Sequence, residues 1–387
     1  MNICLVCDSF PPEDGGGIGT YISNLARALV LKGNNVYVVC KTMENETEEE
    51  LTNGLTIIRK KPSYFPVLER LLPGIGWSLQ VKKICDTLIK AKQLDIIEFP
   101  NWEAPGFIFQ VFNKSFPCVV RVHTPFFETL KMDFSSASLP QKMICKMENY
   151  SCKLSHSLVS STKAHANTIA KEYDYNLSAF KIIPLGIDVH KNAKQSDGKN
   201  SHNLLYVSRL ENRKGTLTLL KAIPKLVEYY PRLTVNIIGK DRPHAPNDML
   251  FTDYFLENFG AFKSNVNFLG FVGDRELLLY YNEATAFVVP SIYESFGLIY
   301  IEAMQHGLPC IATYGGGIPE VVTDRETGLL INPDDDEALV QKVKEILDNP
   351  SFREQLSNNS KRIFHQKFTS EVMASRTLEN YRSVAKL

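Results

Sequence analysis

The sequence has no excess of charge of either sign, no long apolar run and no cysteine spacing typical of a disulfide framework. Its 43 Lys and Arg residues balance its 43 Asp and Glu residues. A nucleic-acid-binding protein is expected to carry a basic face, so we expect no nucleic-acid partner. A local phosphate site is compatible with this balance, because it needs only one or two cations.

No apolar run reaches the ~18 residues that a transmembrane helix requires. The N-terminus enters the apolar segment NICLVC directly, without the charged region that opens a secretory signal. We therefore expect a cytoplasmic protein with, at most, weak peripheral contact with the inner face of a membrane.

The eight cysteines include one Cys-x-x-Cys pair, Cys4 and Cys7. Both lie in NICLVC, which is predicted to be a buried strand, and positions three apart in a strand face opposite sides. Redox pairs usually open a helix instead. We expect reduced thiols here, as in most cytosolic proteins.

Short β-branched runs alternate with amphipathic stretches along all 387 residues, of which 44% are apolar. The length predicts two domains, and the alternation predicts parallel α/β architecture. The predicted strands are Asn2–Cys7, Val36–Cys40, Asp95–Phe99, Val119–His123, Ser157–Ser160, Lys181–Pro184, Leu204–Val207, Thr234–Ile238, Val266–Leu269, Ala286–Val289, Cys310–Ala312 and Leu329–Ile331.

A polar stretch, HKNAKQSDGKNSH, separates two such series and is the best linker candidate. We expect an N-terminal domain over 1–189, a linker over 190–202 and a C-terminal domain over 203–369. The final helical stretch could dock on either domain, and we expect residues 370–387 to complete the first.

The first predicted strand leads into a glycine-rich loop that includes Gly16 and Gly17. Backbone N–H groups at a helix N-terminus attract phosphate, and glycine allows a ligand to approach closely. A dinucleotide fingerprint fails at Ile22, where a small residue is required, and at Lys41, where an acid is required. A plain glycine-rich turn remains an alternative.

Two cations, Arg209 and Lys214, lie across the turn between a predicted strand and a helix near Thr216. Ligands of open α/β sheets bind beyond the carboxyl ends of strands, so this pair would suit a diphosphate. Surface loops also carry such charges routinely, and that interpretation remains open at this point.

The segment 290–322 combines two acids with a helix N-terminus. Glu294 follows a predicted strand, and Glu302 lies eight residues later within the helix. Free N–H groups of Phe296, Gly297 and Leu298 could bind a phosphate, while Glu302 could accept hydrogen bonds from a ribose diol. Alternatively, the two acids only cap and solvate the helix.

At these residues the sequence resembles a known family, the retaining glycosyltransferases of family four, which have the GT-B fold of two Rossmann-like domains facing a cleft. The resemblance rests on Glu-x7-Glu followed by EAMQHGLPCIAT and GGGIPEVV. It extends over most of the chain in the same order, through GGGIGTYISNLARAL, HTP, IPLGID, VSRLENRKG and ETGLLINPDD.

The resemblance implies a role for each matching residue. Arg209 and Lys214 would hold the donor diphosphate and stabilise the leaving nucleotide in place of a metal. Glu302 would bind the ribose, and Glu294 would lie beside the hydroxyl groups of the donor sugar. The remaining matches are His123 near the sugar, Gly16 and Gly17 near the diphosphate and acceptor, Phe296, Gly297 and Leu298 at the distal phosphate, and Gly270, Phe271 and Val272 at the nucleobase.

The implied activity is metal-independent, retaining transfer of a hexose from a UDP- or GDP-type sugar nucleotide to a hydroxyl group of a glycan, lipid-linked or small-molecule acceptor, as in polysaccharide biosynthesis. No cofactor is expected beyond this co-substrate. The mechanism usually drawn is same-face attack without a protein nucleophile, with Glu294 or His123 as the alternative nucleophile. A run of acids, Asp334 to Asp336, precedes a predicted helix and is expected to cap it.

Some features leave alternatives. The loop IIGKDRP replaces a glycine-rich one that the family often has, and Pro224 predicts a kink or early end in its helix. Segment 62–79 could face a sugar, a lipid carrier or a membrane, or cover core, and 124–140 is predicted to be a long loop. A non-catalytic sugar-nucleotide-binding protein and an NAD-type oxidoreductase are the alternative functions.

Overall fold

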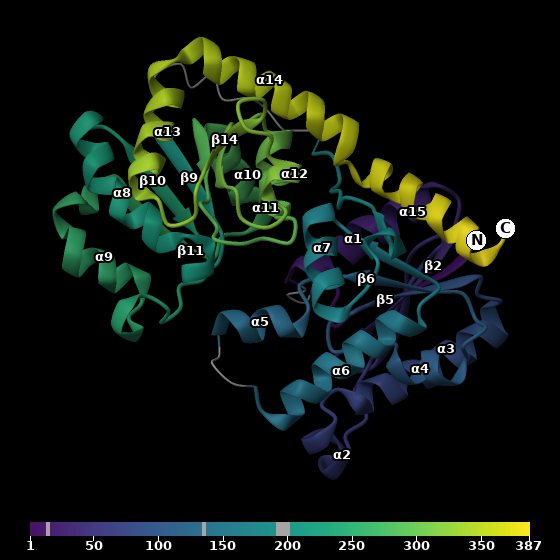
Figure 1. Ribbon diagram of the computed structural model, residues 1–387. Helices are drawn as coiled ribbons and strands as arrows, with labels where there is room; N and C mark the ends of the chain where they lie inside the picture. The colour runs from purple at the N-terminus through teal and green to yellow at the C-terminus, as the bar shows by residue number, and fades with distance from the viewer. Residues whose placement is uncertain (13–15, 134–136, 191–201) are drawn as a thin grey trace. The chain divides into compact units, whose positions relative to one another are not determined.

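The computed structural model describes residues 1–12, 16–133, 137–190 and 202–387, and the chain divides into two compact units (Figure 1). Unit 1 comprises Met1–Asp188 together with Ser370–Leu387, and unit 2 comprises Val189–Thr369. All but the first and last residues of the stretch predicted as a linker, 190–202, lie outside the described residues.

Unit 1 is built around an eight-stranded sheet in the order β3-β4-β2-β1-β5-β6-β7-β8. Neighbouring strands pair in parallel except β3 and β4, which are antiparallel. The strand order reverses between β1 and β5. The strands are β1 (Asn2–Val6), β2 (Asn35–Lys41), β3 (Thr47–Thr52), β4 (Leu55–Lys60), β5 (Ile96–Pro100), β6 (Cys118–Val122), β7 (Ser157–Ser160) and β8 (Phe180–Ile182).

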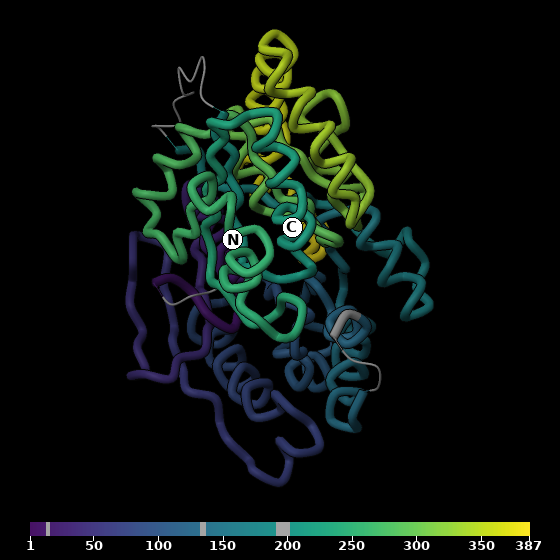
Figure 2. The backbone as a smooth tube through the Cα atoms, turned by 90° about the vertical axis from the view of Figure 1, so that its left-hand side faces the viewer, coloured from purple at the N-terminus to yellow at the C-terminus, as the bar shows by residue number. Residues whose placement is uncertain are grey.

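The helices of unit 1 bury apolar stripes, as in the first helix, where Leu25 and Leu29 are fully buried. Figure 2 shows the same chain path from a second direction. The helices are α1 (Gly16–Leu31), α2 (Pro66–Leu71), α3 (Ile75–Lys92), α4 (Phe107–Phe112), α5 (Phe126–Asp133), α6 (Leu139–Leu154), α7 (Lys163–Tyr173) and α15 (Ser370–Ala385).

Unit 2 contains a six-stranded parallel sheet in the order β11-β10-β9-β12-β13-β14, so its strand order reverses between β9 and β12. The strands are β9 (Asn203–Val207), β10 (Thr234–Ile238), β11 (Val266–Gly270), β12 (Ala286–Val288), β13 (Cys310–Thr313) and β14 (Gly328–Ile331). The helices are α8 (Thr216–Tyr229), α9 (Phe251–Phe259), α10 (Asp274–Glu283), α11 (Leu298–Gln305), α12 (Ile318–Val321), α13 (Asp336–Asp348) and α14 (Pro350–Lys367).

The predicted α/β class is confirmed, and every predicted strand is present with bounds that differ by at most two residues. The structure differs from the predictions in three places. The stretch 124–140 is mainly helical, because it contains α5 and the start of α6. Of the kink or early end predicted at Pro224, the early end does not occur, because α8 continues to Tyr229. The hairpin of β3 and β4 was missed, since β3 (TEEELT) is exposed throughout and has no apolar alternation.

Cys4 and Cys7 are fully buried in and beside β1, as predicted. They contact different thiols, Cys85 and Cys40 respectively, because their side chains lie on opposite faces of the sheet. No helix in the described part of the chain is both long and apolar enough to span a bilayer.

The final helix, α15, packs against α1 and belongs to unit 1. A buried ion pair lies at this junction: Arg121 Nε is 3.3 Å from Glu98 Oε1, and both side chains are 1% exposed. The hydroxyl of Tyr381 on α15 donates to Glu98 Oε2 over 2.8 Å, and that of Tyr21 on α1 donates to Oε1 over 2.5 Å. Arg121 also donates to Thr377 Oγ1 over 3.5 Å. One buried carboxylate thus joins two central strands to both helices.

Candidate functional site

The loops that follow β9 and β12 lie at the reversal of strand order in unit 2. Ligands of open α/β sheets bind in the crevice at such a position, beyond the carboxyl ends of the strands. The first loop carries Arg209 and Lys214, and the second carries Glu294, so these three predicted site residues lie at this edge of the sheet.

Close backbone packing brings the two loops together. Gly215 has φ of +68°, and a Cβ there would lie 2.0 Å from the carbonyl oxygen of Pro290, so only glycine fits without displacing the backbone. The N–H of Ile292 donates to the carbonyl of Arg213 over 2.8 Å. Lys214, which lies between Arg213 and Gly215, is therefore held beside the start of the second loop.

The Nζ of Lys214 donates to Oε1 of Glu294, and their side chains are only 13% and 10% exposed. Burial lowers the pKa of Lys214, partly opposed by Glu294 and reinforced by the charges of Arg213 and Arg209. Burial also raises the pKa of Glu294, but Lys214 and Arg213 outweigh it and leave that pKa below its usual range. The site therefore holds an ionised carboxylate against a buried ammonium group.

A further cation, Arg213, extends this arrangement. Its Nη1 lies 3.6 Å from Glu294 Oε2, and its Nη2 lies 3.9 Å from Glu211 Oε2. Arg209 is more exposed and pairs with Glu211 over 3.2 Å. The sequence prediction included Arg209 and Lys214 but missed Arg213, whose position in the same ENRKG loop was the available signal.

Helix α11 begins directly after the second loop. Gly297 has φ of +88°, and a Cβ there would lie 2.6 Å from the ring of Tyr300, so this cap requires glycine. Phe296 is 2% exposed and packs on Phe368, so its side chain belongs to the core and only its backbone can face a ligand. Leu298 is the first helical residue, and the N–H groups of such a first turn have no intrahelical acceptor.

Glu302 lies one turn into α11, and Oε2 of its carboxylate accepts a hydrogen bond from Tyr281 on α10 over 3.1 Å. Burial raises the pKa of Glu302, and the Tyr281 hydroxyl partly opposes this shift. The ring of Tyr281 stacks on His306 at 5.1 Å and 12°, which fixes its orientation. Tyr281 therefore orients the Glu302 carboxylate, and no local sequence pattern indicated it.

The predicted nucleobase segment lies at the end of β11. Gly270 accepts a hydrogen bond from the N–H of Gly239, at the end of β10, over 2.8 Å. Val272 is 9% exposed, whereas Phe271 is 88% exposed. The segment thus offers a free aromatic ring and backbone groups at the same edge of the sheet as the charged residues.

Unit 1 holds the other predicted site residues. Gly16 and Gly17 open α1 and are both exposed, and among the described residues no other element comes within 4 Å of a Cβ added to either. His123 follows β6 and is half-buried, and its N–H donates to Asn101 Oδ1 over 2.7 Å. Burial, then the charges of Arg121 and His165, lower the pKa of His123 to about 3. Its imidazole is therefore neutral near pH 7.

Glu148 on α6 connects the loops that follow β5 and β6. Its carboxylate oxygens accept the N–H of Glu103 over 3.0 Å and the N–H of Phe126 over 2.9 Å. Burial raises the pKa of Glu148 to about 8, although these two hydrogen bonds oppose the shift. A single buried acid therefore holds both loops at this edge of the unit 1 sheet.

A Glu side chain in the unfolded chain has a pKa of ~4.3, whereas the pKa of Glu148 in the folded protein is about 8. The folded protein therefore keeps the Glu148 proton at pH values at which the unfolded chain has lost it. The free energy of unfolding should therefore fall as the pH rises through this window. We expect Glu148→Gln to reduce that fall by a difference on the order of 2–4 kcal/mol between about pH 5 and pH 9. Chemical denaturation followed by tryptophan fluorescence measures it, since both tryptophans, Trp77 and Trp102, lie in unit 1. Glu379→Gln, at an exposed position of α15, is the matched control, and identical slopes for all three proteins would contradict the expectation.

The acidic run before α13 acts as a helix cap, as predicted. Asp335 Oδ1 accepts the N–H of Ala338 over 2.8 Å. Among the described residues, no group of three or more His, Cys, Asp or Glu side chains is arranged to hold a metal ion.

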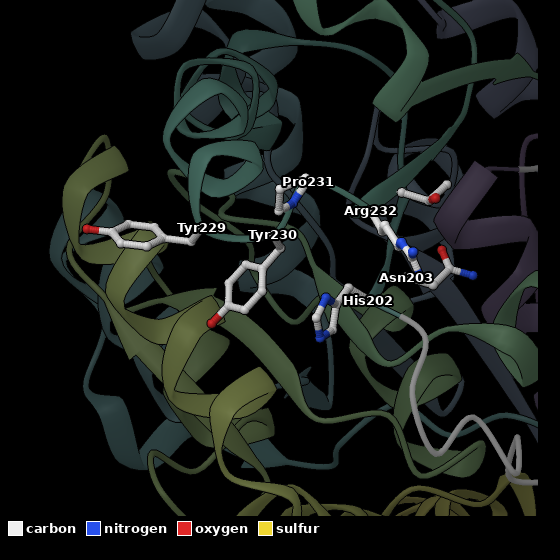
Figure 3. Close-up of a pocket in the computed structure, with 7 residues that line it drawn as sticks. His202, Asn203, Tyr229, Tyr230, Pro231 and Arg232 are labelled. Carbon is white, nitrogen blue, oxygen red and sulfur yellow. The ribbon is translucent and has the colours of Figure 1, made fainter.

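A separate pocket lies at the opposite, amino-terminal end of the unit 2 sheet (Figure 3). Its walls include His202 and Tyr230, whose rings are 4.7 Å apart, and the Tyr230 hydroxyl donates to Asp348 over 2.5 Å. The predicted site residues of unit 2 lie at the carboxyl ends of the strands instead, and none of them lines this pocket.

The sequence matches two family descriptions that together span most of the chain. Residues 15–191 match Glycosyltransferase Family 4, and residues 189–363 match Glycosyl transferases group 1. A glycogen synthase of Mycobacterium tuberculosis is 24% identical over 406 residues, covering 98% of this chain and 94% of the relative.

Solved structures of similar proteins show the same fold. The sucrose-phosphate synthase of Thermosynechococcus elongatus superposes with a TM-score of 0.78 at 22% identity, covering 99% of this chain and 98% of that one. The Anabaena protein HepE, in complex with UDP-glucose, superposes with a TM-score of 0.68 at 19% identity, covering 99% and 100% of the two chains.

Proposed function

The chain belongs to the glycosyl transferases of group 1, with the GT-B fold, and from this premise we propose the reaction that it catalyses. The proposed reaction is metal-independent, retaining transfer of a sugar from a UDP- or GDP-type sugar nucleotide. The acceptor is a hydroxyl group of a glycan, a lipid-linked sugar or a small molecule. Unit 2 would bind the donor, and unit 1 would bind the acceptor.

The observation that carries this proposal is the buried pair of Lys214 and Glu294 at the reversal of strand order in unit 2. A cation and a carboxylate fixed side by side can serve the two halves of a sugar nucleotide. The ammonium group suits the diphosphate, and the carboxylate suits the hydroxyl groups of the sugar. The N-terminus of α11, which follows Glu294, adds N–H groups for the distal phosphate.

Glycosyl transfer places negative charge on the departing diphosphate. Lys214 and Arg209 would stabilise this charge electrostatically, because they are already in position when the bond breaks. Arg213 adds a third positive charge within the same loop. In same-face attack, the departing phosphate oxygen takes the proton of the acceptor hydroxyl, so the chain needs no base of its own.

Glu294 is better suited to bind hydroxyl groups than to attack the anomeric carbon. Its Oε1 accepts from Lys214 and, over 3.1 Å, from Ser291, and its Oε2 lies 3.6 Å from Arg213. A carboxylate engaged at both oxygens is a weak nucleophile. The neutral ring of His123 lies in unit 1 and can donate or accept one hydrogen bond at each nitrogen.

Isothermal titration with UDP, GDP, ADP and NAD tests the donor class. We expect one nucleoside diphosphate to bind and NAD not to bind, since Lys41, where a dinucleotide site needs an acid, is held by Asp8 at 2.9 Å. Slow release of nucleotide from the matching sugar nucleotide would then separate an enzyme from a binding protein. Binding of NAD alone would refute the proposal.

Glu302→Gln is expected to weaken binding of the nucleoside diphosphate about 10–100-fold, because a charged hydrogen bond contributes about 1.5–3 kcal/mol. Tyr281→Phe should weaken it less, since Glu302 keeps its charge and loses only its orientation. Titration calorimetry measures both constants. Glu283→Gln, at the exposed end of α10, is the matched control, and equal affinity of the Glu302 variant and the control would exclude a ribose contact.

A further inference from the structure

Unit 1 exposes a continuous apolar segment on and before α2. No residue of α2 is buried. Five large apolar side chains in this helix and directly before it are each at least 44% exposed. The other exposed apolar side chains of the described chain are mostly scattered singly, which is normal for a protein surface. The segment consists of Tyr64, Phe65, Val67, Leu68 and Leu71.

The interpretation that 62–79 covers core holds only for its second half. Ile75 and Trp77 are buried at 3% and 2% exposure, where α3 begins. Gly76 also packs inward, and its N–H donates to Glu69 Oε1 over 2.8 Å. Residues 64–71 therefore lie exposed next to the buried start of α3.

Helix α6 lies against α2, and Figure 1 shows the two helices together at the edge of unit 1. Met147 on α6 is buried at 4% exposure, with Leu72, the residue after α2, packed against its cluster. The opposite stripe of α6, at helical spacing, is exposed. It consists of Leu139, Lys142, Lys146, Tyr150 and Lys153. The two exposed sets together are called the α2–α6 surface below.

The charged residues of the α2–α6 surface itself are all lysines, and two further cations adjoin it. Lys61 and Arg70 flank the apolar segment, and three lysines lie on α6. Of the two acids in these elements, Glu69 lies next to Arg70 and offsets one of the five positive charges, so the surface keeps a net positive charge. Glu148 is buried, and Glu69 accepts the N–H groups of Gly74 and Gly76, each over 2.8 Å. Among the residues that the structure describes, none of the five cations forms an ion pair.

We propose that the α2–α6 surface docks on an anionic lipid bilayer. Exposed aromatic and aliphatic side chains can enter the interface between headgroups and acyl chains, while cations around them bind anionic headgroups. A second copy of the chain is a poorer occupant, because a two-fold contact would place the same cations against one another. The proposal is independent of the reaction proposed above.

Co-sedimentation with vesicles tests the docking. We expect the protein to sediment with vesicles of equimolar phosphatidylglycerol and phosphatidylcholine and to remain in solution with phosphatidylcholine alone. Lys142→Gln/Lys146→Gln should lower the partition coefficient about tenfold or more, because each cation near an anionic surface adds to binding. The matched control is Lys90→Gln/Lys171→Gln, which removes the same charge from exposed positions of α3 and α7.

A second variant separates the apolar contribution from the charges. Val67→Ser/Leu71→Ser should also weaken sedimentation about tenfold, and both positions are exposed, so the melting temperature should stay unchanged. Failure of the wild type to sediment with anionic vesicles would overturn the proposal, as would equal sedimentation of the control and both surface variants. Analytical ultracentrifugation tests the alternative that a second copy of the chain binds this surface. A dimer that the apolar variant abolishes without affecting vesicle binding would assign the surface to self-association.

Discussion

Replacement of Lys214 by alanine is expected to lower turnover by about 10²–10³-fold, because loss of one preorganised group that stabilises a developing anion costs about 2.7–4 kcal/mol. The side chain is 13% exposed and is positioned by the close approach of Gly215 to the following loop, so water cannot replace it in the same geometry. Release of nucleotide at saturating donor measures the effect. Donor affinity should fall less than turnover does.

Lys221→Ala is the matched control for this prediction, since Lys221 lies on the exposed side of α8. The Lys214 variant should remain folded, because Arg213 still lies 3.6 Å from Glu294 and keeps the buried carboxylate paired. Circular dichroism checks this. Turnover within about threefold of the control would remove Lys214 from the leaving-group role.

Arg121→Met is expected to reduce the free energy of unfolding of unit 1 by about 3–5 kcal/mol, since it leaves Glu98 buried without its counter-charge. Because the Glu98 side chain is only 1% exposed, water cannot solvate its carboxylate once Arg121 has been replaced. The guanidinium also lies 4.6 Å from the ring centroid of Tyr21 and donates to the carbonyl of Ile183 over 3.1 Å, and both contacts would be lost. Denaturation followed by the fluorescence of Trp77 and Trp102 reports on this unit.

The double variant Arg121→Met/Glu98→Gln is the matched test of the electrostatic cause. It removes both charges, while the glutamine oxygen can accept from one of the two hydroxyls, Tyr21 or Tyr381, and its amide NH2 can donate to the other. We expect it to recover a large part of the lost stability, because a neutral pair carries no uncompensated charge. If the double variant is no more stable than Arg121→Met, the loss comes from packing instead.

The fold could be predicted from the sequence because its strands are short apolar runs between amphipathic helices. The charged residues of unit 2 could be located for a related reason. Arg209, Lys214 and Glu294 each follow a predicted strand, and loops after parallel strands meet at one edge of a sheet. Position along the chain was sufficient to place them together.

Partnerships between distant residues could not be predicted. Glu98 and Arg121 stand out as charges within the apolar strands IIEFP and CVVRV, but nothing local pairs them with Tyr381 on the last helix. Likewise, the contact between Tyr281 and Glu302 depends on how α10 and α11 pack. Local periodicity records which side of an element is buried and not what it is buried against.

The return of α15 to unit 1 has a consequence for synthesis on the ribosome. Glu98 and Arg121 are translated early, but Thr377 and Tyr381, their partners on α15, are translated only after all of unit 2. The residues of unit 2 are contiguous and are all available before that. Domains generally fold as units while the chain is being made. The first unit therefore cannot be completed until every residue of the second has been translated, although its own strands are made first.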